Sequence, residues 1–193
     1  LSTEQKEYTA MIIEQAHRLT NLFDRLLRPN QLPVMKLQNI HLVIEKVIQL
    51  TQFDNPKNIT IKRDYDPSIP DLIFDQDKLQ KTVLNIVNNA TQVLNSDSEI
   101  TLKTRAASNK TINGKRIKLC AQISIIDNGP GIPEHIQSTL FYPMVSGRAT
   151  STGLGLSICQ TIIHQHQGKL SCQSRPGHTE FTILLPFNSE KTP

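Results

Sequence analysis

Two glycine-rich junctions, joined by a long loop, constrain the fold more than any other feature of this sequence. An apolar run that predicts a buried strand ends at Ile126, and the letters DNGPG follow at residues 127–131. The letters TGLG at residues 152–155 lead into a segment of helical periodicity that ends at Gly168. Glycine lets the backbone approach another group closely because it carries no Cβ. The fold must therefore place a strand end and a helix start where the backbone comes close to something else.

Apolar spacing along the rest of the chain predicts helices and strands in a mixed order. Apolar residues recurring at helical intervals predict helices at 4–28, at 40–51 with Asn39 as a candidate cap, from Asp75 or Asp77 to 94, and at 154–167. Alternating or short apolar runs predict strands at 34–38, 59–65, 72–74, 99–105, 117–125, 169–174 and 179–186. Asn113-Gly114 is typical of a hairpin turn, and the strand after it is expected to place one apolar face inward: Ile117, Leu119, Ala121, Ile123 and Ile125.

These elements predict an α+β fold of two layers, in which a mixed, mainly antiparallel sheet carries helices on one face. The helix at 4–28 precedes this domain, and its apolar stripe needs a partner helix in this chain or another.

Composition and charge disfavour several classes of function. The net charge of +4 is mild, and Lys and Arg are scattered without a block of like charge, which argues against nucleic-acid binding. No apolar run of about 18 residues predicts a membrane span, and the first residues do not resemble a signal peptide. The three cysteines form no CxxC pair, so we expect free thiols in a cytoplasmic protein. Cys159 lies near His164 and His166, which we interpret as a surface histidine pair rather than a metal site.

The two junctions have chemistry suited to a nucleotide. Asp127, at a strand end, can accept hydrogen bonds from an exocyclic amine, although Asp-Asn-Gly is also an ordinary turn. Gly153 and Gly155, at a helix start, leave free backbone N–H groups at the positive end of a helix dipole, which suits phosphate. The dinucleotide fingerprint, the GxxxxGK[ST] loop and the protein-kinase motifs are all missing.

Two asparagines on the predicted long helix complete the pattern. Asn85 and Asn89 lie one turn apart on an otherwise apolar stretch, where asparagine is unfavourable. Capping or solvent exposure is one explanation. The other is an amide oxygen that ligates Mg²⁺, which keeps waters and phosphate oxygens as its remaining ligands.

The order of these motifs resembles the ATP-binding domain shared by sensor histidine kinases, gyrase, Hsp90 and MutL, the Bergerat-type fold. The resemblance covers roughly residues 34–187 and includes the final hairpin with Gly-x-Thr. It implies ATP and Mg²⁺ as cofactors, with Asn89 as the metal ligand, Asp127 as the acceptor for the adenine amino group, and Thr179 as its support through a water. It further implies that nucleotide contacts come from the glycines and the lid: Gly129, Gly131, Phe141, Thr152, Gly153, Leu154 and Gly155.

Within this family the sequence favours a kinase over an ATPase. The ATPases carry a water-activating glutamate where this chain has Asn85, and an amide cannot take a proton at neutral pH. The lid letters TLFYPMVSGR and the first helix resemble nitrogen-regulation sensor kinases of the NtrB type, as does Gln92 in place of a basic residue. Arg148 on the lid is then the candidate partner of the γ-phosphate, and we assign Asn85 and Arg148 to the catalytic region. Ser151 departs from the glycine expected before TGLGL. A hydrolytic ATPase and a non-catalytic nucleotide-binding module stay as alternatives.

The resemblance also implies the domain organisation and partners. None of the six histidines, His17 included, fits the acceptor motif of such kinases, so we expect the phosphorylated histidine upstream of this chain. Residues 1–33 are predicted to be the second helix of a dimerisation hairpin plus a linker, 34–187 the catalytic domain and 188–193 a tail. The expected partners are a response regulator of the NtrC type, the PII signal protein and a second copy of the full-length protein, with regulator phosphatase activity and without nucleic acid or membrane.

Overall fold

The computed structural model describes residues 32–53, 57–145 and 153–187. The chain divides into two compact units, Leu1–Leu32 and Pro33–Pro193. The predicted first helix, the C-terminal tail and the lid residues Arg148, Ser151 and Thr152 lie outside the described residues.

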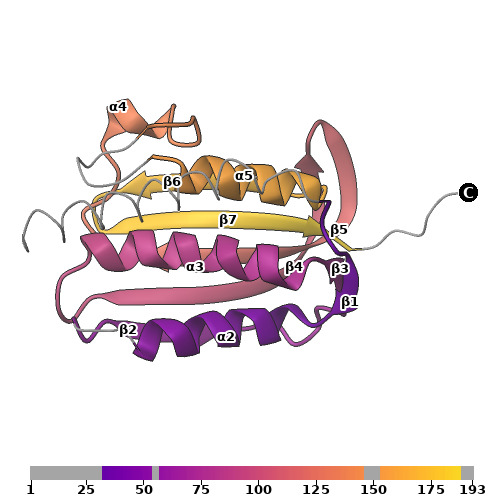
Figure 1. Cartoon of the computed structure of the whole chain (residues 1–193), viewed down its shortest axis with the longest axis horizontal. Helices are drawn as coiled ribbons and strands as arrows, with labels where there is room; N and C mark the ends of the chain where they lie inside the picture. The colour runs from indigo at the N-terminus through magenta and orange to yellow at the C-terminus, as the bar shows by residue number, and fades with distance from the viewer. Residues whose placement is uncertain (1–31, 54–56, 146–152, 188–193) are drawn as a thin grey trace, which may run out of the picture. The chain divides into compact units, whose positions relative to one another are not determined.

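A five-stranded sheet forms the back layer of the second unit (Figure 1). Its strand order is β2-β4-β5-β7-β6. Only β2 and β4 run parallel, and every other neighbouring pair is antiparallel. A separate two-stranded sheet pairs β1 with β3. The strands are β1 (Lys36–Gln38), β2 (Thr60–Asp64), β3 (Leu72–Phe74), β4 (Glu99–Ile112), β5 (Lys115–Asp127), β6 (Lys169–Arg175) and β7 (His178–Pro186).

Three helices cover one face of the large sheet, with α3 between α2 and α5 (Figure 1). The helices are α2 (Ile40–Phe53), α3 (Gln76–Val93), the short α4 (Glu134–Gln137) and α5 (Gly155–Gln165). Their inner faces bury Ile44, Val83 and Ile163 against the strands, in one hydrophobic core. The predicted two-layer α+β architecture is therefore confirmed, including the mixed, mainly antiparallel sheet. No helix among the described residues combines the length and apolarity that crossing a bilayer requires.

Local signals begin and connect these elements as the sequence indicated. Asn39 accepts a hydrogen bond from the His41 N–H at 2.9 Å and so caps α2. Asp75, rather than Asp77, caps α3, because its side chain accepts from the Lys78 N–H at 3.0 Å. Asn113 and Gly114 join β4 to β5 with φ of 49° and 77°, the left-handed backbone that this kind of two-residue turn requires.

The hairpin of β4 and β5 is longer than the strand predicted at 99–105. β2 pairs with β4 only as far as Lys103, and β7 pairs with β5 only from Cys120 onward, so the outer part of the hairpin pairs only with itself. Leu119 is consequently 50% exposed, which corrects its predicted place in the core. An alternating apolar pattern predicts a strand but does not tell where its neighbouring strands and covering helices end.

Candidate functional site

Asp127 ends β5 as a buried carboxylate, 5% exposed. Its Oδ1 atom accepts a hydrogen bond from the Gly129 N–H at 2.9 Å, and its Oδ2 atom accepts none from the described residues. Burial raises the pKa of Asp127, while the Gly129 hydrogen bond and the charge of His178 act in the opposite direction. A buried carboxylate with one oxygen still to be satisfied suits a ligand that presents an N–H donor.

The glycines after Asp127 make room first for the protein itself. A Cβ on Gly129 would lie 2.8 Å from Asp127 Oδ1. Gly131 has a φ of +84°, and its Cβ would lie 2.8 Å from the carbonyl carbon of Arg175 in the turn between β6 and β7. The Gly177 N–H donates to the Gly129 carbonyl at 2.8 Å in the same place. The glycines thus allow the loop to lie directly against this turn. The sequence analysis predicted only contacts with a nucleotide for them.

Ser174 belongs to the same cluster, and no sequence motif pointed to it. Its Oγ accepts from the Ile132 N–H at 2.8 Å and lies 2.9 Å from Thr179 Oγ1. Asp127 pairs with Thr179, and Thr179 pairs with Ser174, across β5, β7 and β6. Thr179 is 4% exposed. The strand register, which sequence alone does not give, brings these three polar side chains into one row.

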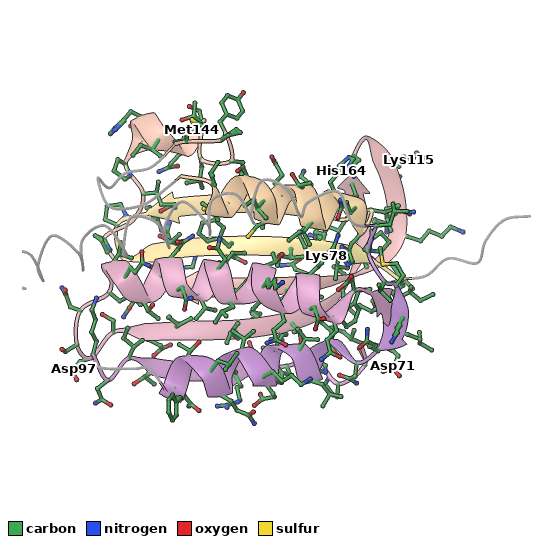
Figure 2. All side chains as sticks on the ribbon, viewed as in Figure 1. Asp71, Lys78, Asp97, Lys115, Met144 and His164 are labelled. Carbon is green, nitrogen blue, oxygen red and sulfur yellow. The ribbon has the colours of Figure 1, made fainter. Side chains whose placement is uncertain are left out.

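The second junction begins α5. Leu154 precedes the first helical residue, Gly155, and makes no side-chain capping hydrogen bond, so the first backbone N–H groups of α5 have no side-chain cap. Gly153 has a φ of +63°, and its Cβ would lie 2.6 Å from the carbonyl carbon of Met144, whose own N–H donates to the Gly153 carbonyl at 3.1 Å. Met144 lies by the loop after α4 in Figure 2. The start of α5 is therefore bound directly to the loop that follows Phe141, a partly buried residue packed against the core.

Asn85 lies against this junction rather than facing open space. A Cβ on Gly155 would lie 2.8 Å from both Oδ1 and Nδ2 of Asn85. The Asn85 Nδ2 donates to Cys159 Sγ at 3.3 Å, and Cys159 Sγ lies 3.8 Å from the Thr82 carbonyl oxygen on α3. Burial raises the pKa of Cys159 to about 11, so the thiol keeps its proton. The side chain of Asn85 therefore joins α3 to the first turns of α5.

Asn89 lies one turn further along α3 and is half-buried. Its side chain makes no hydrogen bond to the described residues. Figure 2 shows Lys78 near the start of α3 and His164 near the end of α5 at the same end of the domain, so the two helices run in opposite directions. The second half of α3, which carries Asn89, therefore lies beside the glycine-rich start of α5. Among the described residues no three His, Cys, Asp or Glu side chains could hold a metal ion.

His166 corrects the interpretation of a surface histidine pair. It is 6% exposed and follows α5. Its Nε2 accepts the Asp75 N–H at 2.9 Å, and its Nδ1 donates to the Ile162 carbonyl at 2.7 Å. Both ring nitrogens are thus used by the neutral form, and burial lowers the pKa of His166. The residue fixes the end of α5 to the start of α3; His164, by contrast, is exposed as expected.

The comparison with known protein families shows to which family this domain belongs. Residues 74–189 match the family model of the histidine kinase-, DNA gyrase B-, and HSP90-like ATPases. The chain belongs to this family. The predicted family is confirmed, and both junctions and the asparagines of α3 lie inside the matched segment.

Relatives within this ATPase family include proteins named sensory histidine kinase/phosphatase NtrB. The chain is 54% identical to the one from Escherichia coli O157:H7 over 183 residues, which is 94% of this chain and 52% of the relative. The Vibrio alginolyticus relative is 52% identical over 94% of this chain and 52% of its own length, and the Rhodobacter capsulatus relative is 37% identical. The chain spans about half the length of the curated relatives that it matches.

Solved structures of histidine kinases share the fold. The structure of full-length ShkA in complex with AMPPNP has a TM-score of 0.76 at 22% identity, over 98% of this chain and 40% of ShkA. The catalytic domain of the histidine kinase ThkA has a TM-score of 0.68 at 24% identity, over 79% of this chain and 95% of that one. At these identities the likeness concerns the architecture of the family and not the individual side chains.

Proposed function

We propose that this chain is the ATP-binding catalytic part of a sensor histidine kinase of the nitrogen-regulation type, in which residues 34–187 form the catalytic domain and 1–33 a dimerisation helix with its linker. The observation that carries the proposal is the buried Asp127 carboxylate, with one oxygen held by Gly129 and the other without a donor among the described residues. It lies in a domain of the histidine kinase and gyrase family. The relatives' name, sensory histidine kinase/phosphatase NtrB, supports the nitrogen-regulation branch.

Adenine recognition follows from the chemistry of this carboxylate. The free oxygen of Asp127 accepts the exocyclic amine, while Gly129 and Gly131 let the loop lie close to a flat base. Thr179, opposite Asp127 on β7, lies next to the same position. A base with a carbonyl in place of the amine would put two acceptors together, so ATP is bound in preference to GTP.

Phosphates and metal are assigned to the other junction. The uncapped N–H groups at the start of α5 donate hydrogen bonds to the negatively charged phosphates. Gly153, Leu154 and Gly155 shape that position together with Thr152. Asn89 holds Mg²⁺ through its amide oxygen; the residues fit this ion, because Mg²⁺ usually takes one or two protein ligands and completes its shell with phosphate oxygens and water. Mg²⁺ supplies neutralisation of phosphate charge, and Arg148 pairs with the γ-phosphate.

Phosphoryl transfer, rather than hydrolysis, is the reaction that the asparagine at position 85 allows. Its amide takes no proton from water, and its Nδ2 already donates a hydrogen bond to the Cys159 sulfur. The catalytic contribution of this domain is positioning and charge neutralisation, which is what phosphoryl transfer needs.

The acceptor of the phosphoryl group is a histidine in the acceptor motif of these kinases. No histidine of this sequence matches that motif. From the histidine the phosphoryl group passes on to an aspartate of a response regulator. The fold relative ThkA was solved in complex with the response regulator protein TrrA. For this protein we propose an NtrC-type regulator, control by the PII signal protein, phosphatase activity toward the regulator, dimerisation of the full-length protein and a cytoplasmic location.

A transfer assay in trans tests this function. The chain is mixed with γ-labelled ATP, Mg²⁺ and a separate protein that carries the acceptor helix and its hairpin from an NtrB relative. We expect acid-labile label on that protein and none on the chain alone. Steady phosphate release that depends on Asn89 would instead support the hydrolytic ATPase. ATP binding without transfer to any acceptor would support a binding module.

A further inference from the structure

Asn128, the residue after Asp127, continues the pairing of β4 and β5 with its side chain. The paired residues end with Ile100 and Asp127. One step further, the Asn128 N–H donates to the Glu99 carbonyl at 3.4 Å, whereas the Glu99 N–H donates to the side-chain Oδ1 of Asn128 at 2.9 Å. In an ordinary antiparallel ladder the main-chain carbonyl of residue 128 would accept this second hydrogen bond. The side chain therefore takes the place of the main chain at this step.

The direction of this hydrogen bond is fixed by its donor. A backbone N–H can only donate, so the amide oxygen of Asn128, and not its nitrogen, faces Glu99. Because the side chain satisfies the Glu99 N–H, the main-chain carbonyl of Asn128 is not held in the ladder, and the backbone can leave the sheet directly after Asp127. The Gly129 N–H then turns back and donates to Asp127 Oδ1 at 2.9 Å, in the pattern of an Asx turn.

The Gly129 hydrogen bond decides how the Asp127 carboxylate is presented. It occupies Oδ1 and leaves Oδ2 for a ligand. It also lowers the pKa of Asp127, against the larger effect of burial, which raises it. We propose that Asn128 is a positioning residue for adenine binding: its amide oxygen replaces a main-chain acceptor, so the chain turns at Gly129 and holds Asp127 with one oxygen toward the base amine. This inference rests on the proposed adenine site.

One peptide unit couples the two hydrogen bonds at this corner. The Asn128 carbonyl and the Gly129 N–H belong to the same planar peptide group. If the side-chain oxygen is removed, the Glu99 N–H can recover a protein acceptor by drawing that carbonyl into the ladder. The rotation that brings the carbonyl toward Glu99 turns the Gly129 N–H away from Asp127. The loss of one exposed amide therefore reaches the buried carboxylate.

Calorimetric titration with ATP, at pH 8 and at lower pH values where circular dichroism shows the chain to be folded, tests this role. We expect Asn128→Ala to bind ATP roughly 2- to 10-fold more weakly at pH 8, as the loss of one hydrogen bond allows. ATP affinity is expected to fall as Asp127 gains a proton, and this fall is expected at a higher pH in Asn128→Ala, because Asp127 loses the hydrogen bond that favours its ionised form. A loss of packing alone would lower the affinity without moving this pH.

A double variant assigns the pH effect to the carboxylate. In an Asp127→Asn background, Asn128→Ala is expected to leave the pH dependence of ATP binding unchanged. The ATP phosphates titrate in the same way with every variant, so they do not contribute to the difference. His178 and Cys172, the other ionisable groups whose pKa or charge is linked to that of Asp127, also stay unchanged in every variant.

Matched variants at the same corner separate positioning from a loss of structure. Glu99→Ala keeps the backbone N–H and loses only the side chain, which pairs with Lys62, so we expect it to change neither the affinity nor the pH dependence. Asn128→Asp keeps an acceptor oxygen and is expected to recover, at pH 8, most of the affinity that Asn128→Ala loses. Unchanged affinity in Asn128→Ala, or a lower affinity with an unmoved pH dependence, overturns the inference. Failure of the wild type to prefer ATP to GTP would instead overturn the proposed adenine site.

Discussion

At the scale of single residues, Gly131 and Gly114 share a left-handed backbone but differ in what surrounds them. Their φ values are +84° and +77°. A Cβ on Gly114 would meet nothing within 4 Å, whereas one on Gly131 would lie 2.8 Å from the backbone of Arg175. The same substitution at the two positions therefore distinguishes backbone strain from the close contact that holds the loop after Asp127.

We predict that Gly114→Ala costs about 1 kcal/mol of stability, from backbone strain alone. Gly131→Ala is expected to cost about 1–3 kcal/mol more, because the loop has to move away from the β6–β7 turn. Urea unfolding of both variants measures the difference. Equal losses would mean that the loop is not held by this contact.

At the scale of elements, the contact between α3 and α5 is set by Asn85 and Gly155. Alanine normally favours a helix over glycine, yet here its Cβ would lie 2.8 Å from the Asn85 amide. We predict that Gly155→Ala lowers the free energy of unfolding by about 1–3 kcal/mol. Asn85→Ala makes room, so the double variant is expected to be more stable than the sum of the single losses indicates. A double-mutant cycle in urea measures this coupling, and simple additivity would contradict the packing described here.

A second link between the same helices depends on pH. The neutral ring of His166 accepts a hydrogen bond from the Asp75 N–H through Nε2. Protonation of Nε2 would place its hydrogen against the hydrogen of the Asp75 N–H. Burial lowers the pKa of His166 below its ordinary value of 6.5; Asp75 raises it and Lys78 lowers it further. A group with a lowered pKa stabilises the fold fully above pH 6.5, and this stabilisation is lost as the pH falls through the folded-state pKa.

We therefore predict that the wild type loses stability on acidification below about pH 6.5 more steeply than His166→Gln. His41, whose pKa burial also lowers, contributes to the same range and stays unchanged in every variant. His164→Gln, at an exposed position of α5, is the matched control. Thermal unfolding between pH 7.5 and 5.5 measures the slopes. Parallel slopes for wild type and His166→Gln would contradict the neutral-ring arrangement.

These two links show where sequence reasoning ends. Among the described residues, periodicity and caps predicted the elements apart from the short α4 and the outer part of the β4–β5 hairpin. These signals depend on neighbours along the chain, as at Asn39, Asp75 and Asn113-Gly114. The contacts of Asn85 with Cys159, of His166 with Asp75 and of Ser174 with Thr179 join residues far apart in sequence. They depend on strand register and helix packing, which no local pattern contains. His166 was consequently placed on the surface, and Ser174 was not identified.

At the scale of the whole molecule, the described parts of both junctions lie within one compact unit, Pro33–Pro193. We predict that a chain starting at Leu32 folds and binds ATP within about 2-fold of the affinity of the whole chain, since the described residues of this unit form a hydrophobic core among themselves. Calorimetric titration of the two chains compares them. A large loss of affinity in the shorter chain would mean that residues before Leu32 contribute to the nucleotide site.

The central claim is that Asp127 binds the amine of adenine, and titration calorimetry with ATP and GTP tests it most directly. Asp71→Ala is the control. Asp71 is an exposed carboxylate, and Figure 2 shows it at the opposite end of the domain from Asp97. Asp127 lies at the Asp97 end, because β5 ends where β4 begins. We predict that the wild type and Asp71→Ala prefer ATP to GTP. Asp127→Ala is expected to lose about 1–3 kcal/mol of ATP binding, roughly 5- to 150-fold. Equal affinity of the wild type for ATP and GTP, or unchanged ATP binding by Asp127→Ala, would contradict the account.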